Sequence, residues 1–242
     1  MSSASKLVAE AIGTFALCFV GASAICITAL QGAGYEGLLG VALAHGLILS
    51  IAISATMNVS GGHVNPAVTI SMLVTRRISA GGAVGYIAAQ LIGGLIAGVC
   101  VLAIFKGMTV PGGDATVTEA AKLGTPAYDP GVLTMGKAIF IEALMTFLLV
   151  FAVFATAVDP RAPKIGGFGI GLTLAADVLM GGPLTGAAVN PARTMGTGLV
   201  AAMAGNFADF WSQQPVYWIG PILGGLAAGL IYDAFVMEKK TP

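Results

Sequence analysis

The chain has 242 residues, of which 57% are hydrophobic and 9% are charged, and its formal net charge is zero. Soluble domains carry roughly 25% charged residues, so this composition excludes an ordinary soluble protein. It predicts a single membrane domain over residues 1–242 in contact with a lipid bilayer. The lack of any basic run argues against a nucleic-acid partner.

The first apolar segment contains no Lys, Arg, Asp or Glu from Ala11 to Tyr35. It is too long for the core of a signal peptide, so we expect it to form the first membrane span. Apolar runs long enough to cross a bilayer recur along the chain. We place six full spans near 7–30, 38–58, 83–105, 133–157, 165–182 and 215–237.

Two further apolar pieces, 65–75 and 190–201, are about half the length that a span requires. Each begins at an Asn-Pro-Ala box. Asn favours the N-cap of a helix and Pro favours its first position. The boxes are Asn65-Pro66-Ala67 and Asn190-Pro191-Ala192. Backbone broken inside a membrane is tolerated where protein buries it or where it lines a water-filled cavity, and we interpret these half-helices as lining a pore.

The two halves of the chain resemble each other. The segment around Glu10 matches the segment around Glu142, and Tyr86–Gly98 matches Tyr217–Gly229. Three spans per repeat is an odd number, so the second copy is inverted and the functional site is expected at the midplane. We place repeat 1 at about 6–105, an outer connecting loop at about 106–132 and repeat 2 at about 133–238.

Positive residues orient the chain, because Lys and Arg accumulate on the inner side of a membrane. With the N-terminus inside, Lys106, Lys122 and Lys137 fall outside, and Arg193 remains within the membrane. The inner residues are Lys6, Arg76, Arg77, Arg161, Lys164, Lys239 and Lys240.

Asn65 and Asn190 are expected to cap their helices through the side-chain oxygen and to turn their amide groups toward the lumen. A water molecule between the two amides accepts hydrogen bonds from both, which interrupts proton hopping along the file. The positive ends of the two helix dipoles also repel cations. Arg193, three residues after Asn190, is expected to line a constriction, and a structural salt bridge is the alternative for it.

Three further residues are expected to support the broken loops. Glu10 and Glu142 occupy matching places in the repeats, and buried carboxylates require donors such as loop N–H groups, so structural support is favoured over a proton relay. His63, two residues before Asn65, is expected to hold its loop by backbone hydrogen bonds rather than to gate the pore.

Over nearly its whole length the chain resembles an aquaporin of the major intrinsic protein family. The similarity includes both Asn-Pro-Ala boxes, both Glu-bearing openings and Gly220-Pro221. The resemblance implies an all-α membrane fold, an inverted repeat of six transmembrane helices plus two re-entrant half-helices. It also implies a homotetramer with one pore per protomer. Thr194, where glycerol facilitators carry Asp, and the pair Tyr217-Trp218 favour water over glycerol.

Family spacing assigns an outer selectivity filter to His45, Val178, Ala187 and Arg193. A His at the first position with a small aliphatic residue at the second resembles the plant tonoplast-type aquaporins. A filter with only one ring is wider, so ammonia, hydrogen peroxide or urea are expected to accompany water. Without its spacing to the first box, His45 would be interpreted as a core histidine bonded to a carbonyl.

Asp177 departs from the pattern of the plant relatives, which usually have Asn there. Neighbouring residues on a helix point about 100° apart, so Asp177 is not expected to line the pore where Val178 does. Two roles remain open for it: orienting His45 or Arg193 from behind, or pairing with a donor in the outer loop.

The sequence thus predicts a passive water channel that excludes protons and ions. A secondary transporter and a structural junction protein are the alternatives, and no nucleophile–base pair or phosphate loop indicates an enzyme. No cofactor or metal is expected, because Cys18, Cys26 and Cys100 lack the spacing of ligands. The short termini favour a prokaryotic inner membrane, and the tonoplast-like filter keeps the vacuolar membrane as the alternative.

Overall fold

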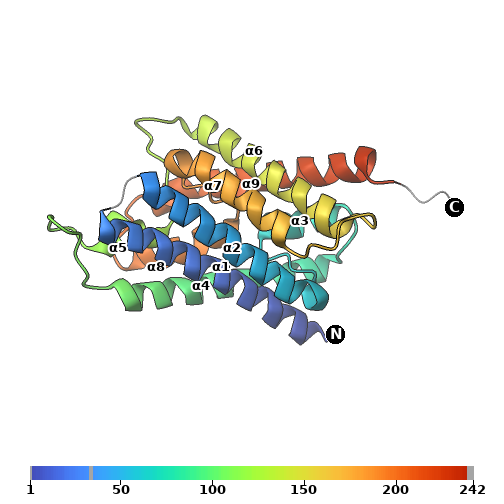
Figure 1. Cartoon of the computed structure of the whole chain (residues 1–242), viewed down its shortest axis with the longest axis horizontal. Coiled ribbons are helices and arrows are strands. Elements are labelled where there is room, and N and C mark those ends of the chain that lie inside the picture. The colour runs from blue at the N-terminus through green and yellow to red at the C-terminus, as the bar shows by residue number, and fades with distance from the viewer. Residues whose placement is uncertain (1, 33–34, 239–242) are drawn as a thin grey trace.

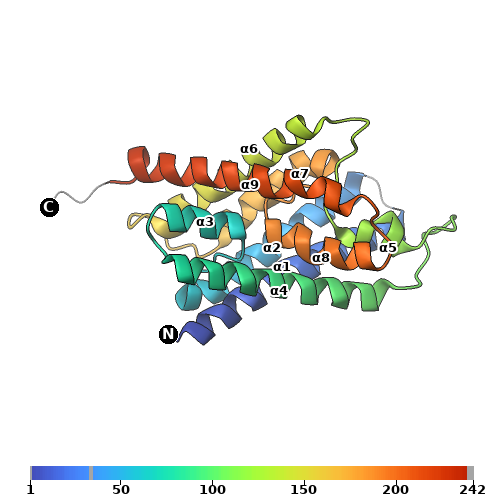
Figure 2. The same cartoon turned by 180° about the vertical axis from the view of Figure 1, so that it is seen from behind.

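The computed structural model describes residues 2–32 and 35–238, and this part of the chain is nearly all helical (Figures 1 and 2). The helices are α1 (Ser3–Gln31), α2 (Tyr35–Ser60), α3 (Pro66–Val74), α4 (Ala80–Phe105), α5 (Val117–Ala120), α6 (Met135–Val153), α7 (Phe168–Thr185), α8 (Pro191–Met203) and α9 (Phe210–Ile231). Helices α6 and α9 each continue into one π-turn, Phe154–Val158 and Tyr232–Val236.

The predicted spans are confirmed. Six of the described helices, namely α1, α2, α4, α6, α7 and α9 with their π-turns, are long and apolar enough to cross a membrane. The two short helices α3 and α8 lie in opposite halves of the bundle, as Figures 1 and 2 show. Their starts at Pro66 and Pro191 agree with the two Asn-Pro boxes.

Helix packing repeats between the two halves. Gly93 of α4 packs against the carbonyl of Ala11, and Gly224 of α9 packs in the same way against the carbonyl of Ala143. A Cβ at either glycine would collide with that backbone, so these positions require glycine for the close approach of α4 to α1 and of α9 to α6. The equivalent contacts show an internal repeat, and the placement of α3 and α8 in opposite halves of the bundle agrees with its inversion.

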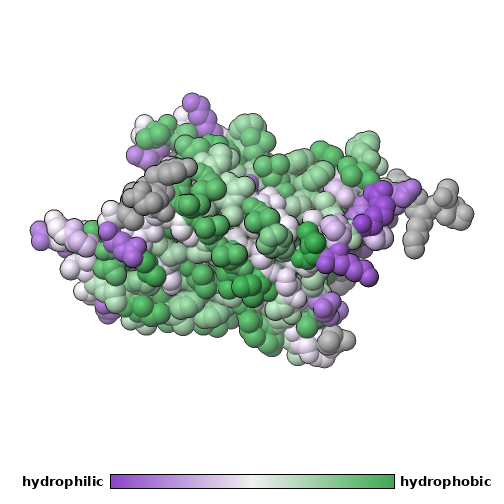
Figure 3. Space-filling model, viewed as in Figure 1, coloured by the Kyte–Doolittle hydropathy of each residue, from purple (hydrophilic) through white to green (hydrophobic). Residues whose placement is uncertain are grey.

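The outer surface of the bundle is apolar around its middle. Figure 3 shows hydrophobic residues over the centre of the face in view and hydrophilic residues toward its two ends. Large apolar side chains are exposed on several helices, including Ile51 of α2 (62% exposed), Val84 of α4 (70%) and Phe140 of α6 (62%). Such an apolar belt is favourable in contact with lipid and unfavourable in contact with water, which fits an integral membrane protein.

The connection predicted as an outer loop at 106–132 is more ordered than its composition suggests. It contains α5 and a 3₁₀ turn, Lys122–Gly124, which places Leu123 fully inside the protein. Gly124 packs against Ala22 of α1, and the Thr125 hydroxyl donates to the Thr197 hydroxyl of α8 at 3.0 Å. The segment therefore folds back over the outer end of the bundle.

Two arginines join segments at the inner end. Arg161 donates to both carboxylate oxygens of Asp159, at 3.0 and 2.6 Å, and to the Val236 carbonyl at 3.0 Å. Arg77 donates to Asp233 at 2.7 Å. The C-terminal end of the last span is thus bonded to two inner loops. Lys239 and Lys240, which were assigned to this side, lie outside the described residues.

Replacing Arg161 with alanine is expected to lower the melting temperature at pH 7. Hydrogen bonds from Arg161 hold the pKa of Asp159 well below its ordinary value of 3.8. A folded-state pKa below that of the unfolded chain means that the carboxylate stabilises the fold above about pH 4, and that this stability is lost as the pH falls further. The difference in melting temperature between wild type and variant should therefore shrink below about pH 4. Tryptophan fluorescence in detergent from pH 7 to 3 measures it, and a difference that grows on acidification would contradict it.

Candidate functional site: a pore between two half-helices

The first broken loop is held by a buried carboxylate. Glu10 of α1 is fully buried, and its Oε1 accepts hydrogen bonds from the Ser60 hydroxyl at 2.6 Å and the His63 backbone N–H at 3.0 Å. Its Oε2 accepts from the Val64 N–H and from the Gln90 amide, both at 2.7 Å. Four donors therefore converge on one carboxylate.

The second loop is held in the same way. Glu142 of α6 is fully buried and accepts from the Thr185 hydroxyl at 2.6 Å and from the N–H groups of Ala188 and Val189 at 3.0 and 2.8 Å. The hydrogen bonds agree with the role predicted for the two glutamates, which is to supply acceptors for loop N–H groups.

The two carboxylates also stabilise an unusual backbone conformation in each loop. Val64 and Val189, the residues before the two asparagines, have φ values of +54° and +44°, which β-branched residues rarely adopt. Conformations of this kind cost roughly 1–3 kcal/mol each and persist only where surrounding contacts enforce them. The short bonds from both N–H groups to Glu10 and Glu142 provide that enforcement.

The two asparagines meet head to head. The Asn65 side-chain oxygen accepts from the Ala67 N–H at 2.9 Å, and that of Asn190 accepts from the Ala192 N–H at 3.0 Å. Each Nδ2 then donates one hydrogen to the opposite loop: Asn65 to the Val189 carbonyl at 2.7 Å, and Asn190 to the Val64 carbonyl at 2.9 Å. Each amide retains a second N–H, and both asparagines line the same cavity.

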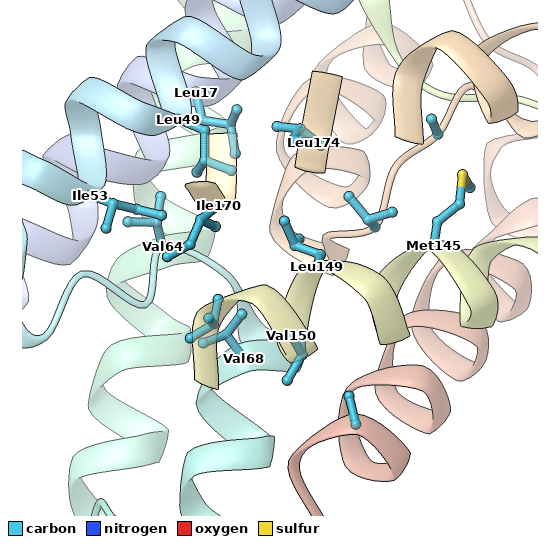
Figure 4. Packing of buried hydrophobic residues seen from close by; sticks show 14 of the residues in the cluster. Leu17, Leu49, Ile53, Val64, Val68, Met145, Leu149, Val150, Ile170 and Leu174 are labelled. Carbon is cyan, nitrogen blue, oxygen red and sulfur yellow. The ribbon is translucent and has the colours of Figure 1, made fainter. Parts of the chain in front are cut away.

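This cavity is narrow and mostly apolar. Its volume is about 10 Å³, close to the space that one water molecule needs. Figure 4 shows buried apolar side chains from several helices in this region, among them the lining residues Leu17, Leu49 and Leu174. It is lined by Leu17, Leu49, Ile53, His63, Asn65, Val68, Leu149, Val153, Ile170, Leu174, Ala188, Val189, Asn190 and Arg193. An apolar wall that carries two amide donors is suited to the passage of water in single file.

A wider vestibule of about 610 Å³ lies toward the outer end and is lined in part by Val178, Gly186 and the outer connecting segment. Arg193 lines both the vestibule and the narrow cavity. The guanidinium therefore lies at the junction between the two, where the predicted filter places it.

Arg193 is bonded to His45. The His45 Nδ1 lies 2.8 Å from the Val41 carbonyl and therefore carries the proton, so Nε2 accepts from the Arg193 Nε at 3.2 Å and from Nη2 at 2.8 Å. The imidazole packs over Gly21, where a Cβ would collide with it. These bonds hold the guanidinium beside α2, while its Nη1 has no hydrogen-bond partner among the described residues.

The other residues predicted for the site differ in whether they line a cavity. Val178 lines the vestibule, whereas Ala187 is fully buried with φ +44° and lines neither of the two cavities. His63 lines the narrow cavity, and its Nδ1 pairs with the Thr69 hydroxyl at 3.1 Å in addition to the backbone bond to Glu10. Asp177 is buried, and its Oδ2 accepts no hydrogen bond from the described residues, so neither of its proposed roles gains support.

Comparison with known proteins agrees with this architecture. Residues 1–232 match the family described as "Major intrinsic protein". The chain is 42% identical over 241 residues to "Aquaporin TIP4-4" of Zea mays (96% of this chain, 87% of that one). It is 37% identical over 247 residues to "Aquaporin TIP2-1" of Arabidopsis thaliana (99% and 90%).

Among solved structures, the aquaglyceroporin of Plasmodium falciparum superposes with a TM-score of 0.83 over 97% of each chain. Its sequence identity is 21%, so that match supports the fold alone. The family match and the plant aquaporins confirm the resemblance stated from the motifs. Together they establish that this chain belongs to the major intrinsic protein family.

Proposed function

We propose that the chain conducts water passively and excludes protons and ions. The observation that carries this function is the pair of asparagine amides, Asn65 and Asn190, facing one narrow apolar cavity at the meeting point of two helix N-termini. A water oxygen at that point accepts from both amides and so donates neither of its own protons along the axis. The positive helix ends and Arg193 add an electrostatic barrier to cations.

The outer filter passes small neutral solutes as well as water. The bonds to His45 keep Arg193 at the wall, and Val178 of α7 adds only a small side chain to the lining of the vestibule. Ammonia, hydrogen peroxide and urea are therefore proposed as secondary permeants, and water is favoured over glycerol. Transport follows the concentration gradient, in contrast to a secondary transporter, whose flux depends on a proton or sodium gradient.

The assembly and the membrane are proposed on the basis of the family to which the chain belongs. We infer a homotetramer with one pore in each protomer, and a channel rather than an enzyme. The chain is an integral multi-pass membrane protein, and its similarity to plant aquaporins of the TIP type supports the vacuolar membrane over the prokaryotic inner membrane.

Stopped-flow light scattering on proteoliposomes tests the proposal. An outward osmotic gradient should shrink the wild-type vesicles well above the rate of empty vesicles, with a low activation energy. Inward gradients of urea, ammonia and hydrogen peroxide on the same preparation test the secondary permeants. Shrinkage at the rate of empty vesicles, with folded protein present, would refute an open pore.

Replacing His45 with phenylalanine is expected to lower the ratio of ammonia to water permeability. Phenylalanine offers no acceptor, so the buried guanidinium of Arg193 loses both bonds and turns toward the water in the lumen, which narrows the filter. Ammonia uptake, followed by a pH-sensitive dye inside the vesicles, measures the change against osmotic water flux. His45→Gln, which retains an acceptor, is the matched control and should fall between wild type and His45→Phe; an unchanged ratio in His45→Phe would contradict the role of the bond.

A further inference from the structure

The inverted repeat pairs each residue of the outer filter with a residue of the inner half. The two asparagines lie 125 positions apart, and the same offset relates the α2 loop end Ser60 to the α7 loop end Thr185, which bond to Glu10 and Glu142 in the same manner. Applied to the filter, this offset pairs His45 with Ile170, Val178 with Ile53, Arg193 with Val68, and Ala187 with Gly62, which has no side chain.

Three of these partners, Ile53, Val68 and Ile170, line the narrow cavity together with Val153, and we call these four residues the inner ring. All four are at most 7% exposed and line the narrow cavity. Figure 4 shows Ile53, Val68 and Ile170 among the buried apolar side chains of this region. Every member is aliphatic, so no side chain of the ring offers a hydrogen bond to a permeant.

The inner ring has a larger residue than the filter at one paired position, Ile53 against Val178, and aliphatic residues where the filter has His45 and Arg193. Val153 stands where the outer half has Gly21, since Glu142 and Glu10 are offset by 132 positions and the same offset joins these two. Gly21 leaves room for His45 to lie against α1 and to hold Arg193 at the wall. In the inner half the equivalent position carries Val153, and the ring has no polar side chain in place of the His45–Arg193 pair.

We propose that the inner ring, rather than the outer filter, excludes glycerol from this pore. A solute that reaches the ring must give up hydration of its hydroxyl groups, and aliphatic walls replace none of those bonds. Water and ammonia are small enough to keep hydrogen bonds to neighbouring water molecules in the single file. Glycerol must pass the same constriction with three hydroxyl groups that lose such bonds. The proposal rests on the proposed function, because it presupposes an open water pore.

Ile53→Ala and Ile170→Ala test the proposal in proteoliposomes. The measured quantity is the ratio of glycerol to water permeability, so that each preparation reports its own folding and insertion through water flux. Each variant is expected to raise the ratio by about tenfold over wild type, because hydrated glycerol then passes the ring. Ile53→Val, which removes one methylene, gives a milder variant with an intermediate rise should the alanine variants fail to fold.

Ile51→Ala is the matched control: it makes the same substitution on the same helix, at a side chain that is 62% exposed on the outer face. It should leave the ratio at the wild-type value. Val178→Ala, which widens the filter, should raise the ratio far less than Ile53→Ala. The proposal is overturned if the ring variants conduct water and keep the wild-type ratio, or if Val178→Ala admits glycerol as well as they do. Absence of water flux in the wild type would instead refute the proposed function.

Discussion

Replacing Glu142 with glutamine is expected to abolish water conduction and to destabilise the fold by about 3 kcal/mol or more. Glu142 accepts three hydrogen bonds while fully buried. A glutamine turns a donor toward the Val189 N–H, and each buried donor without an acceptor costs roughly 1–3 kcal/mol. Val189 then loses the bond that enforces its positive φ, so the second half-helix is no longer held at the midplane. Melting temperature in detergent and osmotic water permeability measure the two effects.

Glu10→Gln is the matched control. It makes the same substitution in the first repeat, where one additional hydrogen-bond partner is present. The Gln90 amide donates to Glu10, and its Oε1 has no hydrogen-bond partner among the described residues. By rotating its amide, Gln90 offers this oxygen to the new amide group, whereas the equivalent position beside Glu142 is Pro221. We therefore expect Glu10→Gln to retain more stability than Glu142→Gln. Equal losses would show that the Gln90 bond does not compensate.

Replacing Arg193 with valine is expected to preserve a water pore and to increase its proton leak by at least about tenfold. A unit charge 4–8 Å from a cation in the file raises its energy by roughly 2–4 kcal/mol at an effective dielectric constant of 20. The helix dipoles and the asparagine pair retain the rest of the barrier. Valine is the residue that the first repeat carries at this position, Val68, so the backbone of the half-helix accommodates it.

Proton leak is measured with an entrapped pH-sensitive dye after an external acid step, beside water permeability on the same vesicles. Arg193→Lys is the control, since it retains the charge and loses the two-point bond to His45. It should remain nearly as proton-tight as wild type. A valine variant that is as tight as wild type would show that the asparagines and dipoles provide the whole barrier.

The short helices were predicted from sequence to within two residues of their ends, because their starts are determined locally. Asn caps the first turn and Pro supplies the first helical residue, so 65–75 and 190–201 correspond closely to α3 (Pro66–Val74) and α8 (Pro191–Met203). Both glutamates were also identified, since matching acids in matching apolar segments need donors and broken loops provide them.

The last span was predicted to begin too late, at 215, whereas α9 begins at Phe210. Ser212, Gln213 and Gln214 give this turn a polar composition. Gln213 is nevertheless buried, because its amide bonds to the backbone N–H and carbonyl of Tyr128 in the outer connecting segment. A tertiary contact of this kind leaves no periodic signal in the sequence. The extension of α7 through Pro183 to Thr185 was missed for a related reason, since proline usually ends a helix.

The hydrogen bonds between the two loops of the pore were not predicted from the sequence. Neither the positive φ of Val64 and Val189 nor the donation from each asparagine to the opposite carbonyl follows from local propensity. The inner-ring residues were also missed, although the offset of 125 positions between the boxes points to Ile53 and Ile170 once His45 and Val178 are identified. The internal repeat therefore identifies residues of the lumen that motif spacing alone does not identify.

The measurement that tests the central claim most directly is water permeability and proton leak on one preparation of wild-type vesicles. Stopped-flow light scattering gives the first and an entrapped pH-sensitive dye gives the second. The head-to-head arrangement of Asn65 and Asn190 predicts water flux far above that of empty vesicles, together with a proton leak that matches theirs. Water flux accompanied by a proton leak that rises with the amount of protein would contradict the barrier assigned to the two asparagines.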